Sequence, residues 1–356
     1  MTNQAEKTTS FFEFWPNTLM YAPVALQWLL LSVKYRSITL PLIANPQLTL
    51  AGMVGVAKSE LMAQADGECL DAILDWEKFT VTESPVADQA NNWIKCIKDM
   101  GLSFPFVCKP DIGCRGSGVK LIRNIEQLQQ TIESYPVGTA LLAQKLASYE
   151  PEAGIFYVKM PNEKKGKVVS LTLKHSPEVT GDGKHSLKEL LQQDARAKDL
   201  LHLYQGKHIE IWDKVLEKGK KLNLVFSASH CHGAVFEDAR VHITPELTDA
   251  INIIMDGLPE FYYGRLDVKF SHLDELKKGK TIEIIEINGA NAESIHIWDK
   301  NSSLIASIKT LLWQYSSLFK LGAHQRSLGH KPPGLIKFYK HWRIETKLAN
   351  YYPDTD

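Results

Sequence analysis

The sequence predicts an α+β protein, in which strands, hairpins and helices are interleaved along the chain. Apolar residues make up 44% of the 356 residues and charged residues 23%, as in ordinary globular proteins with a large core. Short β-rich segments alternate with segments whose apolar residues recur at helical spacing. The loops at residues 162–167 and 277–280 place a glycine among lysines between two β-rich segments, which is typical of hairpin turns. This pattern favours antiparallel sheets over a doubly wound parallel sheet.

The composition excludes several classes of protein. Lys and Arg (41) balance Asp and Glu (41), so no bulk charge indicates a nucleic-acid partner, and we expect none. The five cysteines contain no C-x-x-C pair, which favours reduced thiols and a cytoplasmic location. The first residues lack the basic region and cleavage site of a signal peptide, and the most apolar stretch, 19–33, is too short to span a bilayer.

Residues 1–80 form a predicted N-terminal unit of their own, broken into short elements by prolines. Within it, the apolar and aromatic segment 11–36 predicts a core helix. The alternative is a peripheral, lipid-facing segment with Lys34 and Arg36 beyond it, which would place the protein at the inner face of a membrane. Either a substrate-binding or a membrane-proximal role fits this unit.

A second unit is predicted over residues 81–322, followed by a basic, aromatic extension at 323–356. The unit begins with a linker at 80–88 and a helix that Gly101 ends. The further elements predicted in it are strands at 104–109, 119–122 and 140–146, and helices at 125–135, 186–194, 245–258 and 303–318.

Paired acids near the end of this unit indicate a metal site. Glu286 and Asn288 are two residues apart on a predicted strand and therefore share a face. Across the predicted 277–280 hairpin, Asp267 lies on the adjoining strand with Arg265 on its own face. Such oxygen ligands suit Mg²⁺, and an adjacent arginine could neutralise a developing negative charge. The same residues would also fit an ordinary polar strand face.

A glycine loop changes the balance between these interpretations. Lys109 ends an apolar strand and leads into a loop with Gly113, Gly116 and Gly118. Backbone N–H groups of such a loop can surround phosphate oxygens, and Lys109 supplies a point charge. The loop matches neither G-x-G-x-x-G nor the P-loop pattern. Together, the loop and the distal acids predict a nucleotide site.

Four segments, in this order, resemble the ATP-grasp superfamily: KPDIGCRGSGV, LLAQKL, GRLDVKF and EIIEINGANAE. They are most similar to the branch of D-alanine–D-alanine ligase and cyanophycin-synthetase-like carboxylate–amine ligases, and VTGDGKHSLKELL resembles a segment of cyanophycin synthetase. The resemblance implies an ATP-grasp fold, in which two α+β subdomains grip ATP. It implies ATP and Mg²⁺ as cofactors, with two ions and with Mn²⁺ as a substitute. It also implies a carboxylate and an amine as substrates, joined through an acyl phosphate.

The resemblance assigns a role to each matching residue. The phosphates of ATP would contact Lys109, Gly113, Arg115, Gly116, Ser117 and Gly118. Adenine would border Gln144, Lys145 and Leu146, and Glu152 would bind the ribose. The Mg²⁺ ligands would be Asp267, Glu286 and Asn288, and Arg265 would be the catalytic residue that stabilises the tetrahedral intermediate. A second phosphate-binding lysine is left open among Lys78, Lys95, Lys159 and Lys174.

The chain departs from the family pattern in two places. Gln144 stands where relatives often carry an acid, and residues 1–80 do not resemble the usual substrate domain. Two other functions therefore stay open. One is an ATP-grasp kinase that phosphorylates a hydroxyl, and the other is a non-catalytic, membrane-associated ATP-binding protein. The oligomeric state is also open, with a homodimer as the candidate assembly.

Two further segments could bind ligands. Residues 52–59 differ from the P-loop pattern at one position, where Ala57 replaces the second glycine, and Lys58 and Ser59 could instead bind an anionic part of the substrate or begin a helix. His230, Cys231 and His232 resemble a zinc cluster, but on a strand only the two histidines share a face, so polar residues beside the site are the favoured interpretation.

Overall fold

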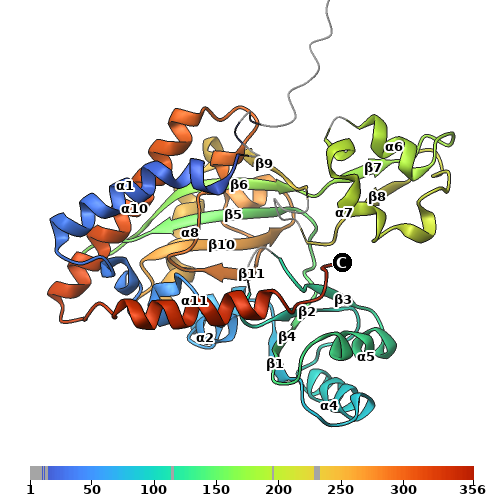
Figure 1. Cartoon of the computed structure of the whole chain (residues 1–356), viewed down its shortest axis with the longest axis horizontal. Helices are drawn as coiled ribbons and strands as arrows, with labels where there is room; N and C mark the ends of the chain where they lie inside the picture. Colours follow the sequence, from blue (N-terminus) through green and yellow to red (C-terminus); the bar gives the residue numbers. More distant parts are fainter. Residues whose placement is uncertain (1–9, 11, 13–14, 114–115, 195, 228–232) are drawn as a thin grey trace, which may run out of the picture.

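Two antiparallel sheets form the framework of the protein. The computed structural model describes residues 10, 12, 15–113, 116–194, 196–227 and 233–356 (Figure 1). Among these residues, every pair of named strands in the two large sheets and in a small third sheet is antiparallel. The predicted α+β class is therefore confirmed.

The smaller of the two main sheets has four strands in the order β1 (Trp76–Thr80), β4 (Ala140–Lys145), β2 (Phe106–Pro110) and β3 (Lys120–Ile122). Two amphipathic helices, α4 (Val86–Asp99) and α5 (Ile125–Ser134), supply their apolar faces to its core. Trp93 and Leu128 from these helices pack with Phe106 and Leu141 from the sheet. The edge strand β1 precedes residue 81, so the chain before that position contributes directly to this sheet.

The larger sheet has five strands in the order β11 (Ile282–Asn288), β10 (Tyr263–Phe270), β5 (Glu152–Val158), β6 (Lys167–His175) and β9 (Val235–Asp238). On one face, Ile251 and Met255 of α8 (Pro245–Asp256) pack against Leu266 and Ile284. The other face is apolar at one end, where Phe156 and Tyr263 contact α10 (Leu304–Ser327), and polar toward the other end.

The N-terminal residues pack around α10. Helix α1 (Asn17–Tyr35) lies along it, with Trp28 edge-on to Phe319 at 5.2 Å between ring centroids. The short elements that follow are η1 (Leu40–Ile43), η2 (Thr49–Gly52), α2 (Lys58–Met62) and α3 (Gly67–Ala72). Gly322 of α10 lies so close to η1 that a Cβ there would come 2.2 Å from the Leu40 carbonyl oxygen. This close contact ties the N-terminal segment to α10.

A compact region is inserted between β6 and β9. It holds β7 (Glu178–Thr180), β8 (Lys221–Asn223), α6 (Leu187–Gln193), η3 (Ala197–Leu200), α7 (Leu201–Gln205) and η4 (Ile209–Ile211). Figure 1 shows it projecting at the upper right. It has a hydrophobic core of its own. Ser186 and Glu189 form a reciprocal cap at the start of α6, which explains where that predicted helix begins.

Most predicted elements are found, with two differences. The strands β10 and β11 pair as the predicted hairpin requires, but their connection also contains a helix, α9 (Leu273–Lys277), that the sequence did not predict. Helix α10 extends to Ser327, nine residues beyond its predicted end. Its last turns pack on η1, a contact that apolar spacing within one helix does not reveal. The remaining elements are η6 (Arg240–His242), η7 (Ile295–Trp298) and α11 (Leu335–Ala349).

No helix in the described part of the chain is both long and apolar enough to cross a membrane.

Candidate functional site

Lys109 connects the two main sheets at the centre of the candidate site. From β2, its Nζ donates to the Gln144 Oε1 at 2.7 Å and to the Ile285 carbonyl oxygen of β11 at 2.8 Å. Burial lowers the pKa of Lys109 to about 8, and the nearby Lys58 acts in the same direction, whereas Glu286 opposes the shift. This buried cation therefore lies where an anionic group between the sheets would meet it.

The predicted metal ligands come together on the polar face of the large sheet. Arg265 pairs in register with Asn288, and Asp267 pairs with Glu286. The Arg265 guanidinium donates to both Asp267 oxygens, at 2.8 and 3.0 Å, and the Asn288 amide nitrogen lies 3.3 Å from Asp267 Oδ2. Glu286 keeps 29% of its side chain exposed, and Lys58 Nζ lies 3.5 Å from it. The structure therefore brings together the residues that the sequence analysis placed on adjoining strands.

Lys174 on β6 lies inside this cluster. Its Nζ is 2.8 Å from Glu152 and 3.1 Å from Asp267, and all three side chains are buried. The other lysines left open at the sequence level lie elsewhere: Lys78 pairs with Asp111, Lys159 pairs with Asp256, and Lys95 is exposed on α4. Only the pairing of β5 with β6 sets Lys174 opposite Glu152, so no local sequence signal singled it out.

The cluster carries an excess of positive charge. Five cations, Lys58, Lys109, Lys174, Arg265 and Lys269, lie around the three carboxylates Glu152, Asp267 and Glu286. Burial by itself would raise the carboxyl pKa values. For Asp267 the charges of Arg265 and Lys174 outweigh burial and hold its pKa well below the usual range. Among these eight side chains the cations outnumber the carboxylates, which favours an anionic ligand.

Two of the residues that the resemblance places at adenine and ribose, Gln144 and Glu152, contact cations of the cluster. Gln144 is buried and accepts from Lys109, whereas the exposed Lys145 pairs with Asp75 at 3.7 Å. Leu146 directly follows β4. Glu152 is held by Lys174 and by Lys269, whose Nζ lies at 3.0 Å, and these two lysines together lower its pKa despite burial.

The described part of the glycine loop is held by the C-terminal segment. Gly118 has a φ of +72°, and a Cβ there would lie 2.5 Å from the Tyr135 hydroxyl, so this position requires glycine. The Tyr352 hydroxyl donates to the Ile112 carbonyl at 2.5 Å, and Thr355 donates to the Gly116 carbonyl at the same distance. Ser117 lies in the turn between Gly116 and Gly118. The predicted phosphate ligand Arg115 lies outside the described residues.

Asp356 fixes the strand that follows the loop. Its carboxylate accepts from the Lys120 Nζ and from the Leu121 backbone N–H, each at 2.9 Å. The C-terminal residues therefore lie beside the loop that would surround phosphates. The sequence indicated only a basic, aromatic extension here, because no motif links these residues to the loop.

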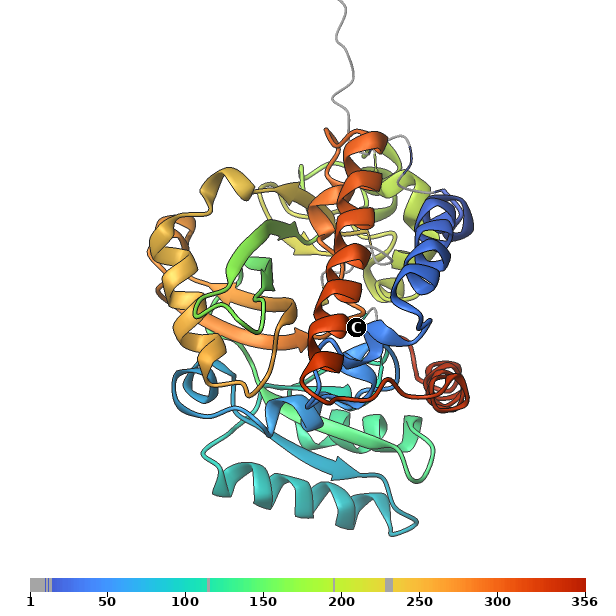
Figure 2. The same cartoon turned by 90° about the vertical axis from the view of Figure 1, so that its left-hand side faces the viewer.

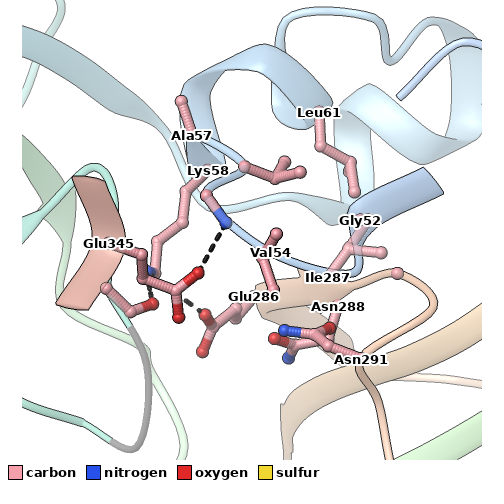
Figure 3. Close-up of a pocket in the computed structure, with 14 residues that line it drawn as sticks. Gly52, Val54, Ala57, Lys58, Leu61, Glu286, Ile287, Asn288, Asn291 and Glu345 are labelled. Carbon is pink, nitrogen blue, oxygen red and sulfur yellow. Dashed lines mark hydrogen bonds and ion pairs between the residues drawn. The ribbon is translucent and has the colours of Figure 1, made fainter. Parts of the chain in front are cut away.

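A pocket opens between the loop 52–58, the end of β11 and α11 (Figure 3). Lys58 reaches across it to donate to the Gly113 carbonyl at 2.9 Å. Glu345 of α11 accepts from the Gly55 backbone N–H at 2.5 Å, so Lys58, Glu286 and Glu345 converge on the pocket. Glu345 was missed at the sequence level, because it is more than fifty residues from the nearest motif.

Lys58 and Ser59 begin a helix, and Ser59 also contacts Asp111, the residue that follows the strand of Lys109. The Ser59 backbone N–H and hydroxyl both donate to the Asp111 carboxylate, at 2.8 and 2.7 Å. Residues 49–52 form η2 and residues 58–62 a single helical turn. The segment therefore lacks the strand–loop–helix arrangement of a P-loop.

The donor set suits a hard cation. In the described residues, no three His, Cys, Asp or Glu side chains are grouped so that they could hold a metal. An ion would therefore depend on the two carboxylates Asp267 and Glu286 together with the Asn288 amide oxygen. Such oxygen ligands fit Mg²⁺ that arrives with phosphate oxygens as its remaining ligands. The zinc alternative at residues 230–232 lies outside the described residues.

Comparison with known proteins gives distant structural likenesses. No protein-family model matches the chain, and a search of curated proteins finds no match. The structure is similar to D-alanine–D-alanine ligase from Bacillus anthracis, with a TM-score of 0.41 and 14% identity over 78% of this chain and 73% of that one. It is also similar to the VanG D-Ala:D-Ser ligase from Enterococcus faecalis, with a TM-score of 0.38 and 12% identity over 73% of this chain and 63% of that one.

A third likeness is to a bifunctional glutathione synthetase from Pasteurella multocida, with a TM-score of 0.34 and 15% identity. It covers 68% of this chain and 34% of that one, so the chain spans about a third of the Pasteurella protein and less than two thirds of VanG. The function proposed below rests on the residues of the site.

Proposed function

We propose that this protein is an ATP- and Mg²⁺-dependent ligase of the ATP-grasp type, which joins a carboxylate to an amine through an acyl phosphate. The observation that carries the proposal is the cluster between the two sheets. There, the buried cations Lys109, Lys174 and Arg265 surround a set of oxygen ligands for a hard cation. Phosphate groups and their metal need both kinds of residue at one place.

The chain's own cations bind and orient the phosphates. Lys109, with a pKa of about 8, is mostly protonated at pH 7 and serves as a point charge for a phosphate. Lys174 is the second phosphate-binding lysine, because it alone among the four candidates faces the cluster. The backbone of Gly113–Gly118 covers the phosphates, and Gln144 to Leu146 with Glu152 border the nucleoside.

Asp267, Glu286 and Asn288 would hold Mg²⁺, which supplies Lewis-acid stabilisation of phosphate charge when it is bound. Asp267 is engaged by Arg265, Lys174 and Asn288 in this structure. Ligand binding must therefore exchange at least one of these contacts. Because Arg265 is one of the partners of Asp267, phosphate binding would be coupled to the orientation of the Arg265 guanidinium.

The reaction has two steps. A substrate carboxylate oxygen attacks the γ-phosphorus of ATP, the bond to the β–γ bridging oxygen breaks, and an acyl phosphate and ADP form. The amine then attacks the acyl carbon, phosphate leaves, and the amine loses a proton. Arg265 stabilises the oxyanion of the tetrahedral intermediate, and the Glu293 carbonyl oxygen, 3.2 Å from Arg265 Nη1, helps to orient its guanidinium.

The test is ADP release from Mg·ATP in the presence of pools of amino acids, small peptides and lipid-headgroup amines, with Asp267→Asn as the control. A ligase requires both an acid and an amine, yields a hydroxamate when hydroxylamine replaces the amine, and is inactive in the control. Phosphate retained on a hydroxyl product would instead establish the kinase. ATP binding with no turnover on any pool would favour the non-catalytic alternative.

A further inference from the structure

Helix α1 presents a wholly apolar surface to solvent. Leu19, Leu26, Leu29, Leu30 and Val33 are 54–79% exposed, although they follow one another along a single side of the helix. The sequence from 17 to 33 contains no charged residue. The opposite side of α1 already packs on the protein through Met20 and Val24, so the outer side is not the core side. A surface helix normally carries polar residues here, and a continuous apolar side marks an interaction surface.

Helix α11 presents a second surface of related chemistry. Its exposed apolar residues are 47–74% exposed, and two of them are aromatic: Leu335, Ile336, Tyr339, Trp342 and Ile344. Its exposed cations are Lys337, Lys340, Arg343 and Lys347. The only acidic residue of the helix, Glu345, is turned inward to the Gly55 N–H. The outer side of α11 therefore combines apolar and aromatic residues with charged residues that are all cations.

The two helices lie along the same side of the molecule, which is the right-hand side in Figure 2, with α1 in dark blue and α11 in dark red. Lys34 and Arg36 add positive charge at the end of α1. Beside α1, an apolar groove toward the start of α10 is lined by Leu19, Pro23, Leu26, Leu304 and Ile308 and adds to the apolar surface. We define the outer sides of α1 and α11 together as the docking face.

We propose that the docking face binds the surface of a lipid bilayer that contains anionic lipids. Leucines that enter the acyl region, aromatic rings at the level of the headgroups and a surrounding set of lysines and arginines are the features of helices that lie in a membrane interface. The cations complement anionic headgroups. A symmetric dimer through the same face would set the cations of α11 near those of its copy, and no exposed acid of these helices would compensate them.

The docking face lies next to the candidate site, because α11 contributes Glu345 to the pocket on its inner side. Binding to a bilayer would therefore bring the pocket close to the membrane surface. The inference does not depend on the proposed ligase function, since it follows from the outer sides of the helices and is tested without ATP.

The test is co-sedimentation of the full chain with vesicles, either of phosphatidylcholine alone or of equal parts phosphatidylcholine and phosphatidylglycerol. We expect binding to the mixed vesicles that weakens as salt is raised. Leu26→Glu/Leu30→Glu should weaken it by about tenfold or more, because two apolar side chains no longer enter the bilayer. Lys337→Glu/Lys340→Glu should weaken binding to the mixed vesicles by about fivefold or more for each charge reversed.

The matched control is Val241→Glu/Ile253→Glu, which places two acids on exposed apolar positions of η6 and α8, outside the docking face. It should bind as the wild type does, and thermal melting should show that all variants are folded. Absence of binding to mixed vesicles, or equal weakening in the control, would overturn the proposal. A wild-type dimer in solution that Leu26→Glu/Leu30→Glu dissociates would assign the face to a second copy and overturn it as well.

Discussion

Replacement of Lys109 by methionine separates the binding role of this lysine from its structural role. Its pKa of about 8, against 10.5 for an ordinary lysine, means that the fold penalises the charged form by about 3 kcal/mol at pH 7. Methionine removes that penalty, but it leaves the Gln144 Oε1 and the Ile285 carbonyl oxygen without their donor, which costs about 1–3 kcal/mol for each group. These terms oppose each other, so the free energy of unfolding should change by no more than about 2–3 kcal/mol.

ATP binding should respond quite differently. Loss of charge-assisted hydrogen bonds from Lys109 to phosphate is worth about 1.5–3 kcal/mol, so the affinity for ATP should fall by about tenfold to a hundredfold. Urea unfolding would measure the stability, and titration with a non-hydrolysable ATP analogue would measure the affinity. Lys95→Met, on the exposed side of α4, is the matched control and should alter neither quantity.

The pH dependence gives a second readout of the same lysine. Because the folded pKa of Lys109 lies below the unfolded value, its charge destabilises the fold at neutral pH, and this cost disappears as pH rises from about 8 to 10.5. ATP binding requires the charged form, so the wild-type affinity should fall by about tenfold per pH unit above pH 8. Lys109→Met should lack this dependence. An unchanged affinity in the variant, or a parallel pH profile, would refute the assignment of Lys109 to the phosphates.

Three further variants test the rest of the site. Asp267→Asn should abolish turnover and lower the free energy of unfolding by about 3 kcal/mol in urea, because its buried cationic partners lose their counter-charge; full stability would contradict the pairing described above. Arg265→Ala should abolish product formation while ATP binding is largely retained, and product formation in this variant would exclude Arg265 as the oxyanion-stabilising residue. Gly118→Ala should lower the melting temperature and weaken ATP binding, because its Cβ would clash with the Tyr135 hydroxyl. Gly138→Ala is its control for backbone strain alone, since it has a φ of +89° in open space, and equal effects of the two would exclude the clash as the cause.

The strands β10 and β11, which carry the predicted metal ligands, show how much of the site could be predicted from the sequence. Residues two apart on a strand share a face whatever surrounds them, so the placement of Glu286 and Asn288 followed from local geometry. The position of Asp267 beside them could be predicted because neighbouring strands joined by a short connection usually pair. The connection itself was predicted too simply, because the single helical turn of α9 depends on the packing of Leu276 into the core.

The residues that complete the site come from distant parts of the chain. Lys174 faces Asp267 only because β5 lies between β6 and β10, and the β5–β6 pairing contains an irregularity next to Phe156 that no sequence pattern reveals. Glu345 and Lys58 meet the end of β11 through the packing of α11 and α2. Contacts between elements so far apart in sequence depend on the whole fold, and local propensity does not encode them.

The sequence by itself determined the α+β class, the order of most elements and the chemistry of the motifs, because hydrophobic period and residue type are local properties. Only the tertiary structure decided which side of an apolar helix meets solvent. Residues 17–33 carry no charge, so the sequence predicted a core helix, with a lipid-facing segment as the alternative, and did not indicate which side would be exposed. Packing against α10 covers one side of α1 and leaves the other exposed, which is the physical origin of the α1 part of the docking face.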